Sequence, residues 1–158
     1  MLPKLTQINA FLKISDQIST AGQPNEAEFL AIKISGHETV INLALEDSPR
    51  ALSNESQILA DLDLEYIHLP VQWEAPTPAD ALRFFEIMNQ HQYQRIFVHC
   101  AANKRVSVFV YLYRVLCLGE DAAIAQDTMH QIWEPNPIWQ NFIDRMLAQF
   151  YPRKAPSL

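Results

Sequence analysis

The residues with the clearest chemical potential lie in segment 98–107, where a cysteine and an arginine stand close together. Cys100 ends a short apolar run, and Arg105 opens a longer one. A thiol at the start of a helix faces the positive end of the helix dipole and unpaired N–H groups, which favour the nucleophilic thiolate. The same N–H groups can hold an oxyanion, and a guanidinium can donate to two of its oxygens at once. The segment therefore predicts a nucleophile and an anion receptor in one loop, with Lys104 adding positive charge.

The elements around this loop alternate between strand-like and helix-like runs. Apolar runs and helical spacing predict strands over 11–14, 39–45, 66–70 and 95–99, a turn over 19–24, and helices over 25–35, 53–63, 78–90, 105–118, 120–133 and 137–150. This alternation indicates an α/β fold, with a central, mostly parallel sheet of about four to five strands flanked by helices. Ligands bind such sheets beyond the carboxyl ends of the strands, which is where Cys100 stands.

Two buried faces are expected within these helices. Thr77 as N-cap and a proline at the first helical position define the start of the helix over 78–90, whose inner face is expected to hold Leu82, Phe85 and Met88 or Asn89. Cys117 is expected to pack inside the apolar face of the helix over 105–118.

Length and composition describe one ordinary globular unit. The 158 residues carry a formal net charge of −6, and 49% of them are hydrophobic. These values predict a single domain over 1–158, and a net negative field that disfavours nucleic acid and anionic membranes. The first residues lack a basic region followed by an apolar stretch, so the protein is expected to be cytoplasmic, with Cys100 and Cys117 as free thiols.

The loop resembles that of the cysteine-based protein tyrosine phosphatase superfamily, which reads His-Cys, five residues, Arg, then Ser or Thr. His99, Cys100 and Ser107 fit this pattern, whereas Arg105 stands one position early and Asn103 replaces the usual glycine. The shorter spacing is similar to that of rhodanese-like sulfurtransferases. It is also similar to a bacterial phosphatase-like branch named after beta-lactamase hydrolase-like proteins, whose landmarks resemble segments 19–24, 40–43 and 66–70.

The resemblance implies a phosphatase-like fold and hydrolysis of a phosphomonoester, such as phosphotyrosine or a small phosphorylated molecule. Cys100 would attack phosphorus to form a phosphocysteine, while Ser107 would donate a hydrogen bond to the thiolate and His99 would support the loop from behind. The phosphate oxygens would be held by the loop that follows the cysteine, namely Ala101, Ala102, Asn103, Lys104 and Arg105.

A phosphatase of this type also uses an acidic side chain to protonate the leaving oxygen. The resemblance places it in segment 71–75, where phosphatases of this type carry an aspartate. This segment contains no aspartate, so Glu74 is the expected general acid, because its longer side chain can still reach a leaving group. Asp80 is expected to cap the following helix instead.

Two alternatives stay open at this level. A persulfide on Cys100 would make the protein a sulfurtransferase, and a pocket that binds phosphate without hydrolysis would make it a phosphoanion-binding domain. The remaining histidines lack metal-site spacing and the three glycines form no nucleotide-binding pattern, so neither a metal nor a cofactor is expected. No motif in the sequence identifies the natural substrate or the oligomeric state.

Overall fold

A computed structural model describes residues 2–151 and shows a five-stranded sheet. The strands lie in the order β1-β2-β5-β3-β4, and every neighbouring pair is parallel except β1 with β2. Their bounds are Leu12–Lys13 for β1, Ile18–Ala21 for β2, Thr39–Asn42 for β3, Glu65–His68 for β4 and Ile96–His99 for β5. The predicted α/β fold with a mostly parallel sheet is confirmed.

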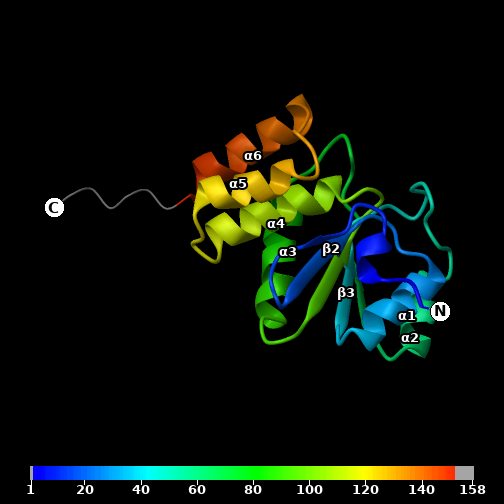
Figure 1. The fold of residues 1–158 in the computed structure, drawn as a ribbon. Helices are drawn as coiled ribbons and strands as arrows, with labels where there is room; N and C mark the ends of the chain where they lie inside the picture. Colours follow the sequence, from blue (N-terminus) through cyan, green and yellow to red (C-terminus); the bar gives the residue numbers. More distant parts are fainter. Residues whose placement is uncertain (1, 152–158) are drawn as a thin grey trace.

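Helices cover both faces of this sheet. The short 3-10 helix η1 (Leu5–Gln7) is followed by α1 (Glu26–Ile34), α2 (Glu55–Asp61), α3 (Pro78–Gln90), α4 (Lys104–Leu116), α5 (Ala122–His130) and α6 (Pro137–Phe150). Helices α1 and α2 lie on one side of the sheet and α4, α5 and α6 on the other (Figure 1). None of the helices within residues 2–151 has the length and apolarity needed to cross a membrane.

The two faces have separate cores because side chains alternate along the buried strands. Val40 of β3 and Phe97 of β5 pack with α1 and α2, whereas their neighbours Ile41 and Val98 pack with α3, α4 and α6. Both strands are buried over their whole length. This explains why their sequences read as nearly continuous apolar runs.

Capping residues start the helices where the sequence predicts them. The helix over 78–90 begins at a Thr77 capping box and has the predicted bounds, as does α6. Two expected burials are wrong. Leu82 is 44% exposed, because α3 turns Ala81, Phe84 and Phe85 toward the core instead. Cys117 is exposed, because α4 ends at Leu116 and leaves it as the C-cap.

The sequence predicts a turn over 19–24, and this prediction is wrong for its first residues, which belong to the strand β2. Segment 18–21 pairs with β5 along its whole length, and Ser19 and Thr20 are buried within the sheet. Its polar residues do not form the apolar run that predicts a buried strand. They can be buried because the folded sheet supplies hydrogen-bond partners, as when the hydroxyl of Thr20 donates to Leu12 O at 2.8 Å. The consequence is that β5 lies between two parallel neighbours.

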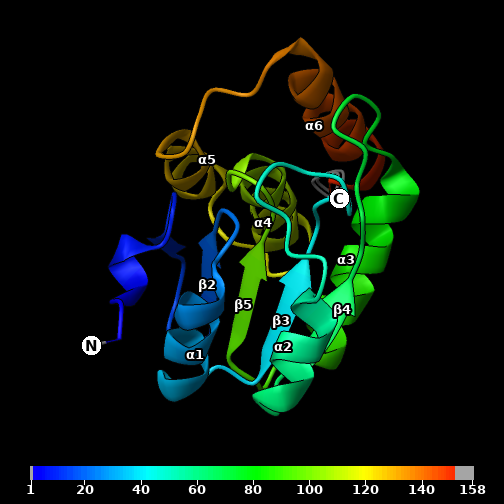
Figure 2. The same ribbon diagram turned by 90° about the vertical axis from the view of Figure 1, so that its right-hand side faces the viewer.

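The parallel strands end at a common edge. In β5, His99 lies opposite Ala21 of β2 and Asn42 of β3. Figure 2 shows the arrowheads of β2, β5 and β3 directed to the same edge of the sheet. Cys100 follows β5 directly, so it lies in the middle of this edge, between the segments that leave β2 and β3.

Candidate active site

The cysteine loop, residues 100–105, connects the central strand β5 to the start of α4. Cys100 is 1% exposed and lies at the base of a pocket of about 380 Å³. Residues of three loops line the pocket: Leu45, Asp47, Ser48, Pro49, Trp73, Cys100, Ala101, Ala102, Lys104 and Arg105. The structure thus brings together Cys100, Arg105 and Lys104, which sequence analysis had placed in one anion-binding loop.

The cysteine loop approaches Gly22 closely. A Cβ atom at Gly22 would lie 2.7 Å from Ala101 O, closer than real Cβ atoms come, and a tight 3.2 Å from the Cα atom of Ala102. The next residue, Gln23, donates its N–H to Ala101 O at 3.2 Å. Gly22 is therefore required by this approach.

The N–H groups of the cysteine loop are available to a ligand. Those of residues 101, 102 and 104–106 have no backbone hydrogen-bond partner among the described residues. They surround the N-terminus of α4, a helix of 13 residues whose dipole adds partial positive charge. Unpartnered N–H groups at a helix start form an anion-binding site.

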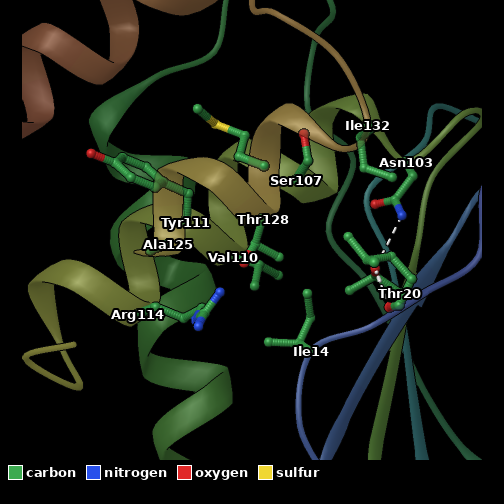
Figure 3. A pocket seen from close by; sticks show the side chains of 12 residues that line it. Ile14, Thr20, Asn103, Ser107, Val110, Tyr111, Arg114, Ala125, Thr128 and Ile132 are labelled. Carbon is green, nitrogen blue, oxygen red and sulfur yellow. Dashed lines mark hydrogen bonds between the residues drawn. The ribbon is translucent and has the colours of Figure 1, made fainter. Parts of the chain in front are cut away.

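Asn103 holds the loop in shape. Its φ of 63° is in the left-handed region, which asparagine tolerates better than most residues. The side-chain amide donates to Ala10 O at 2.8 Å and to the hydroxyl of Thr20 at 3.0 Å, as Figure 3 shows for Thr20. Asn103 therefore lies behind the loop instead of lining the pocket, and ties it to β2.

Arg105 places a buried positive charge beside Cys100. It is 6% exposed, its Nη1 donates to Val71 O at 3.0 Å, and its guanidinium lies 5.9 Å from the ring centroid of Trp73. It forms no salt bridge with any carboxylate among residues 2–151. A guanidinium has five N–H donors, so most of them remain for a ligand. A buried cation without a carboxylate partner favours binding of an anion.

His99 supports the loop from below through a buried network. Its Nε2 lies 2.8 Å from a carboxylate oxygen of Glu55, whose other oxygen accepts from the Gln23 side chain at 2.7 Å. Burial alone would raise the pKa of Glu55, but hydrogen bonding to His99 and its charge lower this pKa below its usual value. The network joins α2, β5 and the segment that follows β2 beneath Cys100.

Ser107 does not make the hydrogen bond predicted for it. Its hydroxyl donates to Lys104 O at 2.6 Å and accepts from the indole N–H of Trp133 at 2.9 Å. A hydroxyl has one proton, so none remains for the thiolate of Cys100. Ser107 instead lines a separate cavity of about 10 Å³, which Figure 3 shows together with Asn103 and Arg114. Ser107 belongs to the first turn of α4, which begins at Lys104.

Glu74 is not among the residues that line the pocket. It is exposed on a turn of the segment between β4 and α3. The neighbouring Trp73 lines the pocket and is fixed in place, because its carbonyl accepts from Trp139 Nε1 at 2.8 Å and its ring lies 5.4 Å from that of Trp133. The structure therefore puts an aromatic wall where the sequence had placed the general acid.

Sequence reasoning missed two acidic residues of this region. Asp47 lines the pocket, and Glu55 pairs with His99 beneath it. Both belong to the connection from β3 through α2, which carries no recognisable motif. A signal for Asp47 was its position shortly after a buried strand, since such connections meet at the carboxyl edge of a parallel sheet. Nothing in the local sequence distinguishes Glu55 from a solvated helix residue.

Comparison with known proteins decides the family. A family model described as DSP-PTPase phosphatase fused to NAD+ kinase, or PTP-NADK, matches residues 6–137, which is most of the chain. The chain belongs to this family. The match confirms the resemblance to cysteine-based phosphatases drawn from the loop. No curated protein matches the chain in sequence.

Solved structures agree with membership of the PTP-NADK family. A DUF442 protein of Shewanella putrefaciens CN-32, designated a candidate phosphatase, is 32% identical with a TM-score of 0.82, over 92% of this chain and 94% of that one. The core catalytic domain of the PP-IP phosphatase SIW14 from S. cerevisiae is 16% identical with a TM-score of 0.71, over 88% and 91%. P. aeruginosa TpbA in complex with pTyr is 15% identical with a TM-score of 0.69, over 89% of each chain. The two distant structures share the fold.

Proposed function

We propose that this PTP-NADK family member is a cysteine-dependent phosphomonoesterase. The observation that carries the proposal is Arg105, a buried guanidinium without a carboxylate partner, beside Cys100 and a row of unpartnered N–H groups. Together these groups form a receptor for the three terminal oxygens of a phosphoryl group, with the sulfur at the base of the pocket. Phosphotyrosine and small phosphorylated molecules are the substrate classes proposed.

The reaction follows from this arrangement in two steps. The Cys100 thiolate attacks phosphorus, the bond from phosphorus to the ester oxygen breaks, and a phosphocysteine forms. Water then attacks that phosphorus, the P–S bond breaks, and inorganic phosphate leaves with the thiolate restored. Arg105 and the loop N–H groups hold the phosphoryl oxygens through both steps, where their charge rearranges. The early position of Arg105 does not prevent it from lining the pocket.

Two turnover assays test the proposal. Hydrolysis of an aryl phosphate and transfer of sulfur from thiosulfate to cyanide are measured from pH 5 to 8 on wild type, Cys100→Ser and Cys117→Ser. Cys117 is the matched control, because it is an exposed thiol at the far end of α4. We expect phosphate release that Cys100→Ser abolishes and Cys117→Ser retains.

Other results would redirect the assignment. Thiocyanate formation that depends on Cys100 would show a sulfurtransferase. Silence in both assays, with binding of inorganic phosphate or tungstate that Arg105→Met abolishes, would show a phosphoanion-binding domain. Phosphate release that persists in Cys100→Ser would exclude the phosphocysteine route.

A further inference from the structure

The pocket above Cys100 contains one carboxylate. Among its ten lining residues, the charged or titratable ones are Cys100, Lys104, Arg105 and Asp47. The first three provide the nucleophile and positive charge, so none of them suits the protonation of a leaving oxygen. Asp47 is the remaining group with a proton to give and take.

The position of Asp47 follows from the sheet. Strand β3 pairs with β5. The pairing continues one residue past the end of β3, since Leu43 N–H donates to His99 O at 2.9 Å. The connection from β3 to α2 therefore leaves the sheet beside Cys100. Ser48 N–H donates to Leu45 O at 3.1 Å, which forms a turn that contains Asp47.

The side chain of Asp47 is not committed to another role. It makes no salt bridge or side-chain hydrogen bond with residues 2–151, and it is exposed at the pocket mouth. Its neighbour Glu46 lines a different cavity, on the far side of the connection, with Tyr66 and His68. Of these two adjacent acids, only Asp47 lines the pocket that contains Cys100.

The alternative acid, Glu74, does not line the pocket. Glu74 follows Trp73, whose carbonyl is bound by Trp139 and whose ring contacts Trp133. Arg105 binds the same segment at Val71 O. These contacts fix the segment with Trp73 in the pocket wall, whereas the exposed Glu74 is not among the residues that line the pocket.

We propose that Asp47 is the general acid and base of the reaction, an inference that rests on the proposed phosphatase function. As the bond from phosphorus to the ester oxygen breaks, its electron pair moves to that oxygen, which takes the proton of the Asp47 carboxyl group. The resulting carboxylate then takes a proton from the water that attacks the phosphocysteine.

Leaving-group dependence tests this assignment. Phenyl phosphate and para-nitrophenyl phosphate are compared on wild type, Asp47→Asn, Glu46→Gln and Glu74→Gln, with kcat and kcat/KM measured from pH 5 to 8. Phenol is the poorer leaving group and needs the proton more. We expect Asp47→Asn to lower kcat about 100-fold on phenyl phosphate and much less on para-nitrophenyl phosphate, in line with the usual contribution of a general acid.

The pH profile provides a second readout. With Asp47 as the acid, any fall of the wild-type rate at high pH depends on this side chain, and Asp47→Asn removes the fall. Glu46→Gln and Glu74→Gln should keep the wild-type profile. Retained activity of Asp47→Asn on phenyl phosphate, or a selective loss in Glu74→Gln, would overturn the assignment while leaving the phosphatase intact. A wild type without Cys100-dependent hydrolysis of either ester would overturn both proposals.

Discussion

The charge of Arg105 is the residue-scale feature on which the site depends. It is a cation in the first turn of α4, where the helix dipole disfavours positive charge, and it is nearly fully buried. Such a residue is stable there only with compensation. Val71 O and the Trp73 ring supply part of it, and a bound anion would supply the rest.

Arg105→Lys tests whether geometry matters beyond charge. Lysine keeps the positive charge but loses the planar fork that donates to two oxygens and stacks on Trp73. We expect kcat for aryl phosphate hydrolysis to fall about 100-fold or more, the usual cost of a lost oxyanion donor. Arg83→Lys is the matched control, because Arg83 is an exposed arginine of α3. Near wild-type turnover of Arg105→Lys would show that charge alone is sufficient.

At the scale of elements, the site depends on β2 passing close to the cysteine loop. This strand brings Gly22 against Ala101 and supplies Thr20 as a partner for Asn103. The loop is therefore held from outside its own sequence, and the left-handed Asn103 is stabilised by contacts with β2 and Ala10. Its shape is a property of two segments about eighty residues apart in the chain.

Gly22→Ala tests this dependence. The added Cβ would lie 2.7 Å from Ala101 O, a backbone atom that can move only if the loop moves. We expect a loss of about 1–3 kcal/mol in the free energy of unfolding, measured by urea denaturation, and a large fall in phosphatase activity. Gly119→Ala is the control: it meets nothing within 4 Å, so only its positive φ costs stability, about 1–2 kcal/mol, and activity should stay. Full activity of Gly22→Ala would contradict this account.

At the scale of the whole molecule, the acid response of stability is set in part by a histidine remote from the pocket. His37 is 2% exposed and packs against Phe97, with ring centroids 5.5 Å apart. Burial, followed by the charge of Arg95, lowers its pKa from 6.5 to about 4. The folded protein therefore keeps this ring neutral under conditions in which the unfolded chain would protonate it.

The expected consequence is a loss of stability on acidification. Between pH 6.5 and about 4 the unfolded state binds more protons than the folded state at His37, so the free energy of unfolding falls as pH falls, by at most about 1.4 kcal/mol per pH unit. Urea unfolding at pH 7.5, 6 and 5 measures this. His37→Gln should flatten the dependence in this window and His130→Gln, at an exposed site, should not. Equal slopes in wild type and His37→Gln would contradict the prediction.

The sequence by itself determined the α/β class, the bounds of the α-helices to within a few residues and the place of the candidate site. Capping residues such as Thr77 and apolar runs such as β3 and β5 act within a few residues, so they can be recognised without the fold. The anion-binding loop was recognisable for the same reason, because nucleophile, backbone donors and guanidinium are neighbours in the chain.

Only the tertiary structure decided which distant side chains meet that loop. Asp47 and Glu74 are both carboxylic acids and lie 27 residues apart in the chain. The order of the strands brings the connection that carries Asp47 to the pocket. In the segment that carries Glu74, Trp73 lines the pocket and packs on Trp133 and Trp139. Contacts between remote segments likewise decide three other features: the partner of Ser107, the role of Glu55 and the existence of strand β2. Such contacts are set by the packing of the whole core, and no local pattern records them.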